Sequence, residues 1–312
     1  MSSIARYFVA PRTPNTAAGF VDDNFAVVDL RRGRHGFSLA SSAVTQLPTG
    51  LITPSFESLN IQDEAELAAI ISQTAEAAGL SNKKRWSVAL PDVAARTLLV
   101  ALESKPSNAR ELNEVIEWKL ERLVTVPPRE LRTSRQKLHS LAGEERYLIT
   151  VARDEVVLQY ESVFANLGWN AGLLLPRHMG EAQWLMLDDA PGDKMLVTAN
   201  LTGFTSLIVR RNEPALVRTF VCGPETIPDE LHRFALYYRD RLNDGAGAAN
   251  ALSRMLVLGG IDQIEARRAV ADALETEPHA LDPAEFGMDL RGEPIKFDHL
   301  AGAAGLATIA WQ

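Results

Sequence analysis

Apolar residues recur at helical spacing between 110 and 123, and this stretch gives the clearest helix signal in the chain. The recurring residues, three or four positions apart, are Leu112, Val115, Ile116, Leu120 and Leu123. Ser107 or Asn108 can cap the first turn, and the double proline at 127–128 forbids a continuing helix. Trp118 lies off this stripe, so its indole must pack against another surface or remain exposed.

The rest of the hydrophobic pattern predicts strands that alternate with amphipathic helices. Strands are predicted at 25–30, 35–44, 85–91, 95–102, 132–141, 146–153, 169–178, 195–200, 204–210, 215–221 and 254–260. Further helices are predicted at 63–80, 154–168, 181–187, 226–242, 263–274 and 297–311. Residues 6–10 are compatible with another strand, whereas the prolines and small polar residues of 11–19 and the small residues of 243–250 predict loops.

One pattern occurs twice in the predicted hairpin arms. Phe25 is followed by an Arg-Arg pair at 31–32, and Phe204 by a pair at 210–211, at the same steps. We interpret this echo as a duplicated hairpin in which the paired arginines form the turn.

Composition excludes several classes of protein. The formal net charge of −8 argues against a general nucleic-acid binder, which normally carries a basic face. Cys222 is the only cysteine, so no intrachain disulfide and no multi-cysteine zinc site can form. The length of 312 residues suffices for one large domain or two coupled ones.

The pattern also predicts no membrane insertion. The start, MSSIARYFVAP, lacks the apolar region and cleavage context of a signal peptide. No run of about 18 apolar residues occurs, and 300–312 is interpreted as a buried helix. We expect a cytoplasmic protein that is peripheral at a membrane only through its partners.

No motif for catalysis or metal binding is present. The chain lacks a P-loop, an H-E-x-x-H and a G-x-S-x-G motif, and its histidines do not stand at metal-ligand spacing. The acids Asp188, Asp189 and Asp193 do not match a calcium loop and are interpreted as a solvated turn. We therefore predict no catalytic residue and no metal site.

The stretch EWKLERLVTVPPREL resembles a helix of PilM proteins, the cytoplasmic actin-like component of type IV pilus assembly. In that family a helix rich in Trp and Glu runs into an aromatic and proline exit, roughly W-E-x-E-x-Y-I-P-F-P. The matching positions are Trp118, Glu121, Val124, Val126 and Pro127. The departures are Lys119 for an acid, Leu123 for the aromatic residue and Thr125 for the first proline.

The element order from 84 to 175 supports this resemblance. Strand-strand-helix-strand-strand-helix is similar to the small inserted subdomain of PilM and of the cell-division protein FtsA. The resemblance implies an actin-like α/β fold of duplicated, ribonuclease H-like halves. Its body would comprise 1–83 and 176–312, with an α+β subdomain inserted at 84–175.

An actin-like ATPase holds phosphates between two hairpin turns, each with an acid beside a glycine. The first turn should lie near Gly19, Asp22 and Asp23, where the order of acid and glycine departs from the family pattern. In the second, Ala199 and Leu201 take the places of the acid and the glycine, or Asn200 and Thr202 after a shift of one residue. Neither register supplies a carboxylate for Mg²⁺.

The adenine side resembles the family more closely. Gly259 and Gly260 follow a predicted strand and could admit a base or sugar, although an ordinary strand-to-helix turn explains them equally well. We predict degenerate nucleotide loops, with no ATP or only weakly bound ATP and little or no hydrolysis. Their candidate residues are Asn200, Thr202, Gly203, Thr205, Gly259 and Gly260.

The resemblance implies a cytoplasmic scaffold in the inner-membrane complex that assembles type IV pili. PilM proteins bind the N-terminal cytoplasmic tail of the membrane protein PilN in a groove between body and insert, and Trp118 is the candidate partner-binding residue. One alternative is the GspL-type component of type II secretion, which normally continues into a transmembrane helix. The other is an active actin-like ATPase, which needs an acidic phosphate loop.

Overall fold

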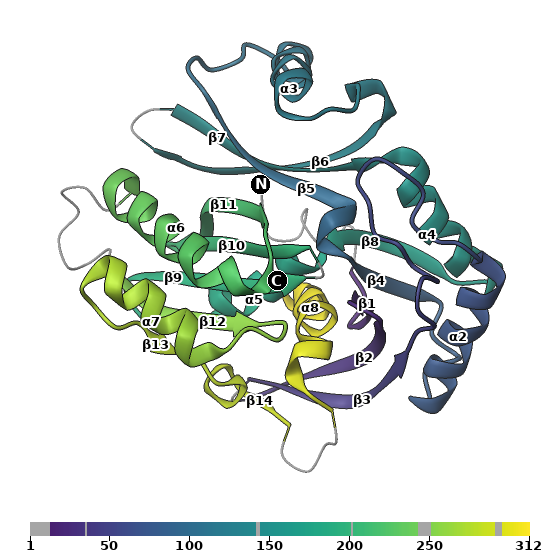
Figure 1. Ribbon diagram of the computed structural model, residues 1–312. Coiled ribbons are helices and arrows are strands. Elements are labelled where there is room, and N and C mark those ends of the chain that lie inside the picture. Colours follow the sequence, from purple (N-terminus) through teal and green to yellow (C-terminus); the bar gives the residue numbers. More distant parts are fainter. Residues whose placement is uncertain (1–12, 35, 142–143, 201, 243–250, 291–294) are drawn as a thin grey trace.

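The computed structural model describes residues 13–34, 36–141, 144–200, 202–242, 251–290 and 295–312. The strands of these residues form three sheets, of six, five and three strands. Figure 1 shows helices between the two larger sheets and on their outer faces, and the small sheet at one end of the molecule. The predicted mixed α/β class is confirmed.

The first half begins with a three-stranded meander and continues with helices that alternate with parallel strands. Its elements are β1 (Thr16–Val21), β2 (Asn24–Gly33), β3 (Gly36–Gln46), α2 (Glu64–Ala77), β4 (Arg85–Leu90), α4 (Asp154–Asn166), β8 (Asn170–Pro176) and α5 (Arg177–Leu187). The strand order is β3-β2-β1-β4-β8, and the short β14 (Met288–Asp289) pairs with the outer edge of β3.

The second half repeats this plan element by element. Its elements are β9 (Asp193–Asn200), β10 (Gly203–Arg210), β11 (Glu213–Val221), α6 (Ile227–Leu242), β12 (Leu252–Leu258), α7 (Gln263–Leu274), β13 (His279–Ala280) and α8 (Phe297–Thr308). The strand order β11-β10-β9-β12-β13 corresponds position by position to that of the first half. The predicted duplication is therefore present in the fold.

Both faces of the central strands in each large sheet are buried, so alternate residues of one strand enter different cores. In β2, Phe25 and Val27 face α2 and α4, whereas Ala26 and Val28 face α5 and α8. In β9, Met195 packs toward α6 and α7, and its neighbour Leu196 toward α5 and α8. The central strands therefore appear in the sequence as largely continuous apolar runs rather than as an alternation of apolar and polar residues.

The sequence echo lies at equivalent positions of the two meanders. Phe25 pairs with Phe20 just after the β1–β2 turn, as Phe204 pairs with Ala199 just after the β9–β10 turn. The expected Arg-Arg turn is only partly correct. The pair at 31–32 lies inside β2, whereas Arg210 ends β10 and Arg211 enters the turn.

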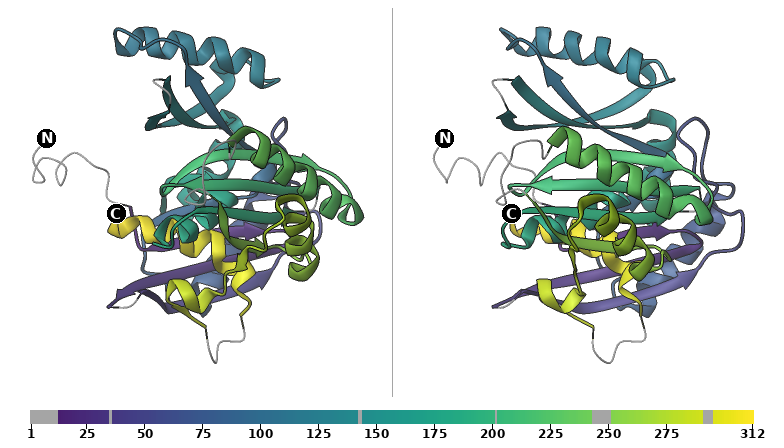
Figure 2. Two further views of the ribbon diagram at one scale, coloured as in Figure 1. Left: turned by 90° about the vertical axis from the view of Figure 1, so that its left-hand side faces the viewer. Right: turned by 60° about the vertical axis from the view of Figure 1, so that its left-hand side comes forward.

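The inserted subdomain is a three-stranded antiparallel sheet covered by one helix. Its elements are β5 (Ala95–Leu102), α3 (Ala109–Leu123), β6 (Leu131–Leu141) and β7 (Glu144–Arg153), in the strand order β5-β7-β6. Asn108 caps α3 by accepting a hydrogen bond from the Glu111 backbone N–H at 2.9 Å, as predicted. Figure 2 shows α3 and this sheet as separate layers above the body.

The two faces of the insert sheet have different partners. One face packs on α3 through residues that include Val100, Tyr147 and Ile149, and Phe56 of the body enters this core. The other face packs against the second half, where Leu138 and Leu148 join the core that contains residues of β10. The insert is thus fixed to both halves of the body.

The predicted bounds of the insert, 84–175, are too wide. β4 pairs in parallel with β1 and with β8, so both strands complete the body sheet. The helix α4 packs with α2 on the outer face of that sheet. The inserted residues are therefore 95–153, and the first half of the body resumes at Asp154.

The interpretation of 11–19 as a loop is also wrong in part, because β1 begins at Thr16 and all six of its residues are buried. The run Ala17, Ala18 and Gly19 has low intrinsic preference for strand, and the neighbours β2 and β4 determine its conformation. The proposed strand at 6–10 and the predicted loop at 243–250 lie outside the described residues.

Two crossing helices, α5 and α8, fill the space between the sheets. A side chain at Gly305 would overlap the carbonyl oxygen of Gly180, and one at Gly180 would overlap that of Gly302. The glycines therefore allow the two helix backbones to touch. Trp184 of α5 closes the crossing by donating its indole N–H to the Ala301 carbonyl oxygen at 2.9 Å.

We predict that Gly305→Ala destabilises the protein by a few kcal/mol, about the cost of overpacking a core, because a methyl group at this position meets backbone rather than a movable side chain. Urea unfolding followed by fluorescence measures the change. The control is Gly33→Ala, whose new methyl group would approach only the Gly36 carbonyl oxygen at 3.7 Å. Equal midpoints for the two variants would contradict the prediction.

Candidate functional site

The turns of the two meanders meet across a cleft between the halves. A pocket of about 180 Å³ at this place is lined by Phe20, Asp22, Thr53, Pro54, Pro91, Asp92, Val93, Arg177, Asn200 and Thr202. Asp22 comes from the first turn, Asn200 and Thr202 come from the second, and Arg177 begins α5. Thus the structure brings the two predicted phosphate loops together.

The second turn uses its polar side chains internally. The Asn200 side-chain oxygen accepts hydrogen bonds from the Thr202 backbone N–H and hydroxyl, each at 2.9 Å. The last paired residues are Val21 and Asn24 in the first hairpin and Asn200 and Gly203 in the second. Thr202 therefore corresponds to Asp23, and a hydroxyl stands where the first turn has a carboxylate.

A buried arginine lies at the base of the cleft. Arg177 is 2% exposed, and its guanidinium donates to the Thr198 hydroxyl at 2.9 Å and to the Ala199 carbonyl oxygen. Room for the side chain comes from α8, because a Cβ atom at Gly302 would lie 2.6 Å from the Arg177 Cγ atom. A cation of the protein itself therefore lies next to the second turn.

Two acids of the first half neutralise this cation. The Arg177 Nε atom lies 3.2 Å from the Glu181 carboxylate, and its Nη2 atom lies 3.6 Å from Asp92. Asp92 also accepts a hydrogen bond from the His178 backbone N–H at 2.9 Å and contacts His178 Nδ1 at 2.8 Å. The other ring nitrogen of His178 lies 2.9 Å from the Thr97 hydroxyl of the insert.

The protonation of this cluster follows from its burial and its charges. Burial alone would raise the pKa of Asp92, but the charges of His178 and Arg177 and the hydrogen bonds outweigh it, so that pKa is lowered. Burial raises the pKa of Glu181 to about 7, and Arg177 only partly opposes it. Burial would lower the pKa of Arg177, but the surrounding carboxylates raise it.

Four of the six predicted nucleotide residues do not line the pocket. The Thr205 hydroxyl lies 3.1 Å from that of Thr219, and Gly203 is required because a Cβ atom there would overlap the Phe220 carbonyl oxygen. At Gly259, a Cβ atom would lie 2.6 Å from the Ala199 carbonyl oxygen, so this glycine serves packing. Gly260 faces open space.

Local sequence patterns did not predict the buried charge cluster. Its only signal in the sequence is the spacing of Arg177 and Glu181, which lie one helical turn apart at the start of a mostly apolar helix. Within the described residues, no group of three or more His, Cys, Asp and Glu side chains could hold a metal ion. No helix among them is long and apolar enough to cross a membrane.

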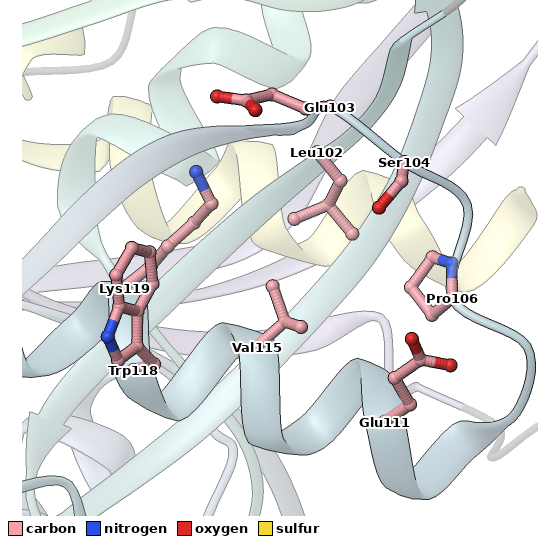
Figure 3. Close-up of a pocket in the computed structure, with 8 residues that line it drawn as sticks. All are labelled: Leu102, Glu103, Ser104, Pro106, Glu111, Val115, Trp118 and Lys119. Carbon is pink, nitrogen blue, oxygen red and sulfur yellow. The ribbon is translucent and has the colours of Figure 1, made fainter.

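Trp118 projects from α3 beside Lys119 (Figure 3). It is 49% exposed and borders a pocket lined by Leu102, Glu103, Ser104, Pro106, Glu111, Val115, Trp118 and Lys119. The Arg122 guanidinium lies over its ring, 3.8 Å from the centroid. All these residues belong to the insert, so Trp118 does not contribute to a groove between insert and body.

A separate groove of about 280 Å³ does run between insert and body. It is lined by Leu90, Ala95, Arg132, Thr133, Ser134, Thr150, Ala152, Val157, Glu161, Gly172, Leu173, Leu174 and Pro176. Its walls include β6 and β8, which are edge strands of their sheets. Arg132 bridges the two parts through ion pairs of 2.7 Å to Asp154 and 2.5 Å to Glu161.

We predict that Glu181→Gln stabilises the protein increasingly as the pH rises. Folding raises the pKa of Glu181 from 4.5 to about 7. Between these pH values the folded wild-type protein binds more protons than the unfolded chain, so its free energy of unfolding falls as the pH rises through this range. The advantage of the variant at about pH 8 should be on the order of a few kcal/mol, at about 1.4 kcal/mol per pKa unit.

Urea unfolding of wild type and variant between about pH 5 and about pH 8 tests this linkage. Glu76→Gln, on the exposed surface of α2, is the control for loss of a carboxylate. A Glu181→Gln advantage that stays constant with pH would show that the buried carboxylate does not titrate in this range.

Comparison with known proteins identifies the fold. No protein-family model and no curated protein matches the sequence. A chain of the PilM–PilN type IV pilus biogenesis complex aligns with 97% of this chain and 100% of its own, at a TM-score of 0.77 and 17% identity. A Bacteroides thetaiotaomicron protein with an actin-like ATPase fold aligns over 99% of both chains, at a TM-score of 0.53 and 10% identity.

The cytoplasmic domain of EpsL, an inner membrane component of the Vibrio cholerae type II secretion system, aligns with 95% of this chain and 93% of its own, at a TM-score of 0.47 and 10% identity. A likeness at that level says nothing about function. The first two alignments and the duplicated halves agree with the predicted resemblance to PilM: this chain has the actin-like ATPase fold.

Proposed function

We propose that this protein is a cytoplasmic scaffold of type IV pilus assembly and that it binds the N-terminal cytoplasmic tail of a PilN-like inner-membrane protein. The main support for this proposal is the structural similarity to a chain of the PilM–PilN complex, which extends over 97% of this chain and includes the insert. The protein then lies at the inner membrane through its partner.

The groove between insert and body suits an extended peptide. The edge of β8 opposite β4 and the edge of β6 opposite β7 have no strand partner among the described residues, so their backbone groups can pair with a peptide. Leu173 and Leu174 of β8 and Val157 of α4 contribute apolar groups to the groove lining. Backbone pairing then supplies affinity, and the apolar lining of the groove selects the peptide side chains that contact it.

We predict that Ser134→Arg weakens binding of a PilN tail peptide by at least about tenfold, or about 1.4 kcal/mol. Ser134 is exposed on β6, lines the groove and pairs with Thr150 of the groove lining, so a long cationic side chain there fills the peptide site without disturbing a core. Fluorescence anisotropy with a labelled peptide measures the affinity.

The matched control is Gln136→Arg, which adds the same charge on the same strand at an exposed position outside the groove lining. A peptide that binds wild type, Ser134→Arg and Gln136→Arg equally would exclude the groove as its site. If the wild type bound no PilN tail but did bind the cytoplasmic part of a type II secretion protein, the protein would be assigned to type II secretion instead of pilus assembly.

We further propose that the cleft is a degenerate nucleotide site with little or no ATP hydrolysis. Two features support this: the second turn lacks a carboxylate at Thr202, and Arg177 with its two acids occupies the base of the pocket. Without a second acid, hydrated Mg²⁺ loses one of its anchors beside the phosphates.

Calorimetric titration with Mg·ATP should show no binding in the micromolar range, and phosphate release should equal that of a blank. The variant Gly260→Asn serves as the probe of the adenine side, because Gly260 faces open space with a φ of +77°, which asparagine tolerates. Micromolar affinity in wild type that is lost in Gly260→Asn would establish a working nucleotide site and overturn the proposal.

A further inference from the structure

A pocket of about 440 Å³ opens where the insert meets the second half of the body. It is lined by His139, Ser140, Arg146, Arg210, Arg211, Glu213, Pro214, Ala215 and Leu242. It shares no lining residue with the cleft pocket or with the groove between insert and body. The resemblance to PilM assigned no role to these residues.

Positive charge dominates the walls of this pocket. Three arginines and a histidine face one acid, Glu213, in a chain whose net charge is −8. That acid is already engaged, because its carboxylate lies 2.7 Å from His139 Nδ1 and accepts the His139 backbone N–H at 2.9 Å. Arg210 is neutralised from behind by Asp193, at 2.6 Å.

The other two arginines have no carboxylate partner within the described residues. Arg146 of β7 makes only a long hydrogen bond, 3.4 Å, to the Ala215 carbonyl oxygen. Arg211 is exposed and forms no hydrogen bond or ion pair with any described residue. Two unneutralised guanidinium groups therefore border one cavity, one from the insert and one from the second half.

The backbone at Arg211 adds an independent observation. Arg211 has a φ of +53° and Asn212 a φ of +60°, so the β10–β11 turn requires the left-handed region at both positions. Asparagine tolerates this region, but an arginine there is unfavourable. A residue kept in an unfavourable conformation beside a binding cavity is typical of functional sites.

We propose that this pocket binds a small anion that carries two or more phosphate charges. The guanidinium fork matches phosphate oxygens in pairs, and the volume lies in the range of small-molecule sites. A bound anion contacts Arg146 of the insert and Arg211 of the second half together, so it also fixes the insert relative to the body. This inference does not depend on the proposed pilus function.

Calorimetric titration of the full chain with pyrophosphate tests the proposal. Arg211→Asn and Arg146→Gln should each weaken binding about tenfold, the effect of losing one charge-assisted contact. Arg211→Asn should leave the melting temperature unchanged or raise it, because asparagine suits the left-handed turn. Weaker binding without loss of stability separates a ligand contact from a structural role.

Arg268→Gln, at an exposed position of α7 outside the pocket, is the control for the loss of one positive charge. The proposal is overturned if pyrophosphate does not saturate the wild type, or if Arg268→Gln weakens binding as much as Arg211→Asn. It is also overturned if Thr202→Glu, which adds a negative charge to the lining of the cleft pocket, abolishes the binding, because that result would place the anion in the cleft.

Flotation with vesicles distinguishes two sources of the phosphate. Binding to vesicles that contain cardiolipin, whose headgroup carries two phosphates, but not to phosphatidylcholine vesicles, lost in Arg211→Asn, would identify a lipid headgroup. Saturable pyrophosphate binding without flotation would identify a free phosphate compound.

Discussion

The close contact between α5 and α8 is the constraint on which the rest of the structure depends. Gly180 and Gly305 allow the two helix backbones to touch between the sheets, and Trp184 of α5 donates a hydrogen bond to the Ala301 carbonyl oxygen of α8. Helix α5 follows β8 of the first half and α8 ends the second half, so the contact fixes how the two β-meanders face each other. The cleft, its two turns and the position of the insert all follow from this packing.

The same crossing explains the charge distribution at the cleft. Because Gly302 lacks a side chain, Arg177 can run across α8 and reach the strand that precedes the second turn. The surrounding acids hold the cation there, and burial raises the pKa of Glu181 to about 7. An actin-like ATPase places nucleotide charge and a metal ion between its turns, and here protein side chains form a charge network at the base of that space.

The insert adds further surfaces to the actin-like body. It packs on the second half through one face, carries α3 on the other, and leaves β6 at the edge of its sheet beside β8 of the body. Edge strands and an apolar lining are features of a surface that binds an extended peptide. The arginine pocket at the opposite junction offers a second place where a ligand could join insert and body.

The sequence by itself determined the elements whose residues carry a strong local pattern. The apolar stripe and the cap at Asn108 predicted α3, and the buried strands and helices of both halves were predicted from periodicity, as was the duplication from Phe25 and Phe204. Local patterns did not predict β1, because its small residues take their conformation from neighbouring strands. They also could not place β4, α4 and β8 in the body, since strand pairing between distant residues is a property of the folded chain. The cluster of Arg177, Asp92 and Glu181 was likewise decided by tertiary structure alone, because only packing against Gly302 and burial bring these charges together.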